Sequence, residues 1–209
     1  MFKTIRSTIL LALFAGAIHA GPIYSVTLDT SNLSPAGTYF LGFQFGGGTV
    51  LGDNLVSLGN FTFGGGSASG VPFILGGASG SLASGVTITN SDDPNILAEQ
   101  FTPGSVLQFD LTFTTNFSGG TPHQFVWSIL DDSFTPIPTT SNDPLSPVLT
   151  FIVDSANPTI STYGAFFGNQ FPVVTLQGQG TTTPEPGTWL LTGLGLTGMF
   201  VGQRAIRRS

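Results

Sequence analysis

The chain has 209 residues, of which 29 are Gly, 14 are Pro and none is Cys, and only 8% of them are charged. This length suits one domain with short appendages, and the lack of Cys excludes disulfide frameworks and cysteine-based centres. All five cations lie in the first six or the last six residues, and all eleven carboxylates lie between them. A body without Lys or Arg cannot neutralise a phosphate backbone, so nucleic acid is excluded as a partner.

Residues 1–20 have the layout of a secretory signal peptide. Lys3 and Arg6 give a positive start, residues 9–15 form an apolar centre, and small residues follow. Cleavage after Ala20 and cleavage after Ala17 both agree with this layout. We therefore expect export, with a buried N-terminal helix as the alternative interpretation.

The body, residues 21–176, places apolar side chains at every second position over many short runs. This spacing is typical of strands with one buried face, and clusters of Gly, Pro, Asn and Asp separate the runs. About nine such strands predict an all-β fold, an antiparallel β-sandwich or jelly roll. The predicted strands are residues 24–29, 39–45, 55–63, 86–90, 107–114, 124–130, 148–154, 160–166 and 172–177.

Three segments lack this alternation. Residues 70–85, rich in Gly, Ser and Ala, are expected to form a long loop or a weak edge hairpin. Residues 95–100 are the one stretch whose spacing also allows a single helical turn. Residues 177–183 are Gly- and Thr-rich and predict a linker.

Acidic residues cluster at two predicted strand ends, and Ca²⁺ prefers six to eight such hard oxygen ligands. The sequence therefore suggests Ca²⁺ ligands there, although Asp and Asn also form turns without any ion, and neither spacing matches a known calcium loop. The candidate ligands are Asp92, Asp93, Asp131 and Asp132.

Little in the body suggests catalysis. His123 is the one histidine left after removal of the leader, and we expect it to be solvated at the start of a strand. No G-x-S-x-G motif supplies a nucleophile, and one His without Cys cannot make a zinc site. Glu99 is the only Glu of the body, so a glycosidase pair of carboxylates is not expected. The sequence predicts a protein that is not an enzyme. Trp127 and the tyrosines could stack on sugar rings, but we expect most of these aromatic residues to belong to the core.

The C-terminal segment, residues 184–209, combines three features. The tripeptide Pro184-Glu185-Pro186 is held extended by its prolines. Residues 187–202 are apolar and uncharged, and as a helix they would span about 24 Å, short of the roughly 30 Å hydrocarbon core. A basic tail follows, which would hold that end in the cytoplasm, and its cations are Arg204, Arg207 and Arg208.

The order of tripeptide, short apolar span and basic tail resembles the PEP-CTERM sorting signal of exported bacterial proteins. The resemblance implies that a membrane-embedded exosortase recognises the segment and removes or transfers it. Residues 24–31 and 39–45 also resemble the small exported β-sandwich domains that precede such signals. An ordinary tail anchor is the alternative.

From these features we expect an exported structural or interaction protein that is sorted to the cell envelope or the extracellular polymer matrix. The alternative is a Ca²⁺-assisted, carbohydrate-binding sandwich, whose partner would be an extracellular polysaccharide.

Overall fold

The computed structural model describes residues 22–114, 121–153, 158–165, 168 and 170–177. The expected signal peptide and sorting signal, including Pro184, Glu185 and Pro186, lie outside these residues, as does the linker beyond residue 177. Within the described ranges, no helix is long and apolar enough to span a bilayer.

The described residues form twelve strands, more than the nine predicted, and the predicted all-β class is confirmed. These are β1 (Ile23–Asp29), β2 (Tyr39–Gly46), β3 (Leu55–Thr62), β4 (Ser67–Leu75), β5 (Ala78–Ser81), β6 (Gly85–Thr89), β7 (Asn95–Thr102), β8 (Val106–Thr114), β9 (His123–Leu130), β10 (Leu149–Val153), β11 (Thr159–Thr162) and β12 (Val173–Leu176).

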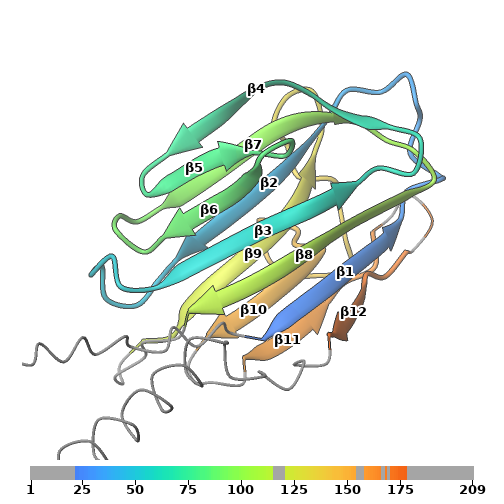
Figure 1. Ribbon diagram of the computed structural model, residues 1–209. Coiled ribbons are helices and arrows are strands. Elements are labelled where there is room, and N and C mark those ends of the chain that lie inside the picture. Colours follow the sequence, from blue (N-terminus) through green and yellow to red (C-terminus); the bar gives the residue numbers. More distant parts are fainter. Residues whose placement is uncertain (1–21, 115–120, 154–157, 166–167, 169, 178–209) are drawn as a thin grey trace, which may run out of the picture.

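The strands form two antiparallel sheets of six that face each other (Figure 1). Sheet A has the order β12-β1-β8-β3-β6-β5, and sheet B has the order β11-β10-β9-β2-β7-β4. Pairing is nested: β1 lies against β8, β2 against β7 and β3 against β6. β5 pairs with β6 in sheet A, and β4 pairs with β7 in sheet B. The predicted all-β sandwich of antiparallel sheets is therefore confirmed.

Aromatic side chains from both sheets fill the space between them. The ring of Phe109 on β8 lies 5.9 Å from that of Phe43 on β2 and 5.0 Å from that of Trp127 on β9, in edge-to-face contacts. All three side chains are fully buried, and each contributes about 2–3 kcal/mol by its burial. Trp127 is therefore one of the core aromatics, and it is not available to stack on a sugar.

The expectation of a helical turn is wrong. Residues 95–100 belong to strand β7, which pairs with β2 on one side and β4 on the other and turns Leu97 and Phe101 into the core. Ladders on both sides and two buried side chains outweigh the local spacing. Residues 70–85 contribute the second half of β4 and all of β5, which lie at edges of different sheets. β5 pairs with β6 from Ser81 and Gly85 onward and forms an antiparallel hairpin at the edge of sheet A. The edge-hairpin alternative is therefore confirmed for the second half of this segment, and the long loop is not found.

Candidate functional site

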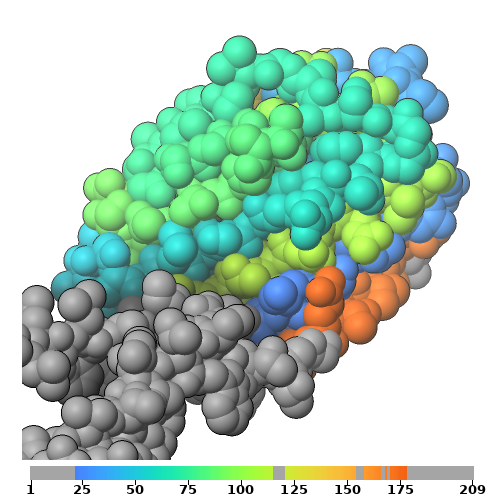
Figure 2. Space-filling model, viewed as in Figure 1, coloured from blue at the N-terminus to red at the C-terminus, as the bar shows by residue number. Residues whose placement is uncertain are grey.

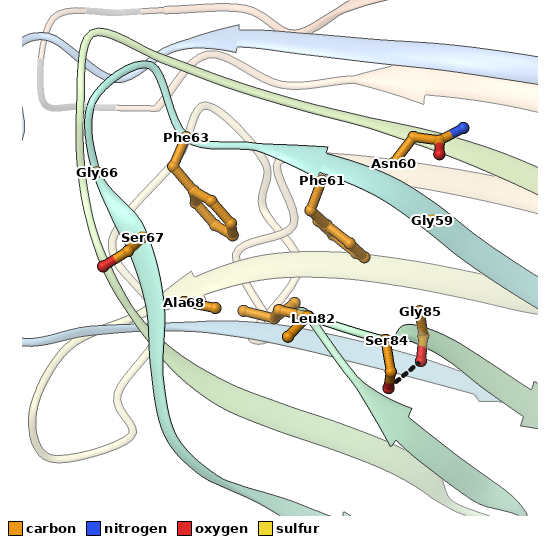
Figure 3. Close-up of a pocket in the computed structure, with 11 residues that line it drawn as sticks. Gly59, Asn60, Phe61, Phe63, Gly66, Ser67, Ala68, Leu82, Ser84 and Gly85 are labelled. Carbon is orange, nitrogen blue, oxygen red and sulfur yellow. Dashed lines mark hydrogen bonds between the residues drawn. The ribbon is translucent and has the colours of Figure 1, made fainter.

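A pocket of about 640 Å³ opens at one margin of the sandwich, between β3, the start of β4 and the turn that joins β5 to β6 (Figure 3). Its walls therefore come from both sheets. The lining side chains include Asn60, Phe61, Phe63, Ser67, Leu82 and Ser84.

A β-bulge in β3 turns two aromatic rings into this pocket. Gly59 pairs with Asp110 and Thr62 with Gln108, so β3 holds one residue more than β8 between these pairs. Asn60 lies in this bulge and has a φ of 55°. This is a left-handed conformation that Asn tolerates better than most residues. The bulge therefore changes which side chains of β3 face inward. Even-numbered residues such as Leu58 face the core before the bulge, and odd-numbered residues such as Phe61 face it afterwards.

The rings of Phe61 and Phe63 lie nearly parallel, 6.4 Å apart at 13°, and Figure 3 shows both pointing toward Leu82 and Ala68. The ring of Phe61 also stacks on the buried Phe109 at 5.4 Å. Packing on the core thus fixes the orientation of the pocket floor, while Phe61 and Phe63 themselves remain half-buried.

The turn between β3 and β4 is held tightly against the turn between β7 and β8. The N–H of Ser105 donates to the carbonyl of Gly64 at 3.0 Å. At Gly66 a Cβ atom would lie 2.0 Å from the carbonyl oxygen of Thr102, so only glycine fits at this wall of the pocket.

A buried carboxylate lies behind the pocket. Glu99 on β7 is 3% exposed, and its Oε2 accepts a 2.6 Å hydrogen bond from the backbone N–H of Leu82. Burial raises the pKa of Glu99 above its ordinary value, and the N–H of Leu82, which favours the charged form, offsets part of that rise. Glu99 is not among the residues that line the pocket.

No residue that lines the pocket is charged. The polar residues that line it are Asn60, Ser67 and Ser84. The hydroxyl of Ser67 points away from Phe63 and Ala68 in Figure 3, and the hydroxyl of Ser84 lies 2.9 Å from that of Ser81. The amide of Asn60 donates to Oδ2 of Asp110 at 2.8 Å, outside the pocket. Aromatic faces with a neutral polar rim suit an uncharged, hydroxylated ligand.

The structure places the two predicted acidic pairs at opposite ends of β2. Asp93 lies beside Gly46 at the end of β2. If Gly46 carried a Cβ atom, that atom would be 2.7 Å from Oδ1 of Asp93. Asp131 and Asp132 follow Leu130, which pairs with Phe40 at the start of β2. The two pairs therefore do not form one site, and neither pair lines the pocket.

Asp131 acts as a turn-forming residue. Its Oδ1 accepts hydrogen bonds from the backbone N–H groups of Ser133 and Thr135, both at 2.9 Å. Asp92 bonds through its backbone carbonyl, which accepts from the amide of Asn95. Among the described residues, no three His, Asp or Glu side chains converge in a group that could hold a metal ion.

His123 is buried, so the expectation of a solvated histidine is wrong. It is the first residue of β9 and is 5% exposed. The glycine loop after β2 covers it, because a Cβ at Gly48 would lie 2.8 Å from its Nδ1. Asn90 lies on its other side, with Nδ2 3.5 Å from Nε2. Nδ1 has no hydrogen-bond partner in the described structure.

Buried asparagines fasten the loops at this end of the sandwich, a role that the sequence analysis missed. The side chain of Asn95 donates to the carbonyl of Phe45 at 3.0 Å and accepts from the N–H of Gly77 at 2.7 Å. The side chain of Asn90 accepts from the N–H of Asn54 at 2.8 Å. Runs of Asn and Asp between strands were the available signal, but they also occur in ordinary turns.

The pocket was not predicted from the sequence. The signal was Asn60 between two alternating runs, since a residue that tolerates positive φ within a strand is typical of a bulge. Without the register of β8, however, the change of face at Phe61 could not be located.

No family model matches the chain, and neither a curated protein nor a solved structure matches it.

Proposed function

We propose that the chain is an exported structural or interaction protein that is sorted to the cell envelope or the extracellular polymer matrix through residues 184–209. The observation that carries the proposal is the pairing of a leader-like N-terminus with a tripeptide, apolar span and basic tail at the C-terminus. An exosortase-type enzyme would be the processing partner, and residues 187–202 would hold the membrane before processing.

The body is consistent with this role. It has no Lys or Arg, so it offers no cationic group to bind a phosphorylated or carboxylate substrate. A sandwich of two six-stranded sheets is a rigid module that can be displayed outside the cell.

Deletion of residues 184–209 tests the sorting proposal in a host that carries an exosortase. We expect the shortened protein to leave the envelope fraction and to appear in the periplasm or the medium. The control is replacement of Thr183 by Ala, just before the tripeptide, which should leave fractionation unchanged. If the deleted and intact chains fractionate alike, the proposal is wrong.

The pocket favours a second candidate function, the binding of a neutral carbohydrate. Sugars present apolar ring faces that stack on aromatic side chains and hydroxyls that bond to neutral polar groups. Phe61 and Phe63 supply the first kind of surface, and Ser84, whose hydroxyl also bonds to that of Ser81, supplies the second. In this candidate function, Ca²⁺ at either acidic pair would stabilise a loop away from the pocket.

Affinity electrophoresis of the chain through gels that contain a neutral polysaccharide tests this second function. The variant Phe61→Leu keeps an apolar side chain but removes the ring, and we expect it to bind about tenfold more weakly. The control Phe134→Leu changes an exposed ring outside the pocket and should bind as the unaltered chain does. Equal retardation of all three proteins would contradict sugar binding at this pocket.

A further inference from the structure

The edge strand β4 carries an exposed apolar surface. Val71 is 90% exposed and Phe73 is 53% exposed, and Ile74 and Leu75 beside them are also exposed. β4 is the outermost strand of sheet B and pairs with β7 alone among the described strands, so its other backbone edge has no strand beside it. Four large apolar side chains within five residues of an open edge indicate a contact surface rather than scattered exposure.

This strand lies in the uncharged part of an otherwise anionic body. No Asp, Glu, Lys or Arg occurs from residue 54 to residue 91, a segment that includes β3, β4, β5 and β6. The other described residues carry nine carboxylates and no Lys or Arg. In Figure 1 the uncharged strands β4, β5 and β6 gather at one margin, opposite β12, and Figure 2 shows their surface in green.

The distribution of charge selects the partner. Two copies of an anionic body repel each other wherever carboxylates face carboxylates, and the β4 margin is where this repulsion is weakest. A basic partner would be drawn to the carboxylates instead. A second copy presents the same uncharged apolar strand, and a two-fold axis would place the two strands against each other.

We propose that two copies of this chain associate through β4, with the two strands antiparallel. Asp92 lies beside Gly76, just after the C-terminal end of β4. If Gly76 carried a Cβ atom, that atom would be 3.1 Å from the Cβ of Asp92. The antiparallel arrangement keeps the two Asp92 carboxylates at opposite ends of the contact. Pro72 has no N–H, and β4 is irregular between Ser69 and Phe73, so the contact rests mainly on apolar side chains.

The absence of Cys from the chain allows a direct test by cysteine cross-linking. Three variants of the full chain each carry one cysteine, in place of Val71, Phe73 or Leu75. Membranes are prepared from cells that express each variant, and a copper–phenanthroline oxidant is added to them. A disulfide requires Cα atoms within about 7 Å. We expect a disulfide-linked dimer whose yield is highest at one of these positions. The control is Val173→Cys on β12 at the opposite margin, whose exposed fraction of 62% lies between those of Phe73 and Val71, and its yield should be at least tenfold lower.

A second variant separates specific association from collision. Val71→Asp adds a charge at a side chain that buries almost nothing, so the fold should persist, and combined with Leu75→Cys it should reduce the dimer yield about tenfold. The proposal is overturned if β4 and β12 cysteines cross-link equally, if no β4 position cross-links, or if β4 links only to a different protein.

Discussion

The carboxylate of Glu99 accepts a 2.6 Å hydrogen bond from the backbone N–H of Leu82, and this bond joins the two sheets behind the pocket. Glu99 belongs to β7 of sheet B, and Leu82 belongs to the turn between β5 and β6 of sheet A. The bond holds that turn in place as a wall of the pocket. It also keeps an ionisable group inside the sandwich, where burial disfavours its charged form.

This contact makes stability depend on pH in a defined direction. Because burial raises the pKa of Glu99, the folded chain binds a proton more tightly than the unfolded chain. The stabilisation is complete below the unfolded pKa of about 4.3 and is lost as the pH rises through the folded pKa. In thermal melts from pH 3.5 to pH 7, we expect the melting temperature of Glu99→Gln to fall less with rising pH than that of the unaltered chain, because the glutamine side chain carries no proton to lose.

The control for this series is Asp132→Asn, which removes an exposed carboxylate. Its melting temperature should follow that of the unaltered chain across the same range. If the melting temperature of Glu99→Gln varied with pH in the same way as that of the unaltered chain, the carboxylate of Glu99 would not be desolvated.

Asn60 determines whether Phe61 and Phe63 face the pocket. A β-branched residue is strained at a φ of 55°, so Asn60→Val should lower the free energy of unfolding by about 1–2 kcal/mol and weaken carbohydrate retention. Asn60→Gly relaxes the backbone but loses the bond to Asp110, and we expect it to keep the pocket. Chemical denaturation measures the stability. A Val variant as stable as the Gly variant would contradict a bulge at this position.

Asp131 distinguishes turn formation from calcium binding. Its Oδ1 accepts two backbone N–H bonds, so Asp131→Ala should cost about 1 kcal/mol in calcium-free buffer. Asp131→Asn retains an acceptor oxygen and should cost less. Calcium is then titrated into both the unaltered chain and Asp131→Asn while the melting temperature is followed. If calcium raised the melting temperature of the unaltered chain but not that of Asp131→Asn, Asp131 and Asp132 would form a calcium site.

Glu185 is the single charge of the tripeptide that a processing enzyme could recognise. Glu185→Ala keeps both prolines, and we expect it to block processing without blocking export. A larger, membrane-retained form should then accumulate on immunoblots of fractionated cells. The control Thr183→Ala should be processed normally. Intact tails on mature protein from the native host would favour a plain anchor instead.

Much of the sandwich could be predicted from alternation alone. In β8 the sequence places Leu107, Phe109, Leu111 and Phe113 on one face, and all four are buried. The period-two pattern is reliable where one strand face meets the core and the other meets solvent. It fails for β4, whose apolar side chains remain exposed, and for β5, whose residues are mostly Gly, Ser and Ala.

Composition and charge were fixed by the sequence without reference to any fold: the absence of Cys, the cations confined to the termini and the uncharged stretch of residues 54–91. Only the tertiary structure decided how these residues meet. Pairing with β8 fixed the bulge at Asn60, nested sheet order brought Glu99 to Leu82, and the length of β2 kept the two acidic pairs apart. These relationships join residues distant in the chain, and they depend on strand register, which local sequence preferences leave open.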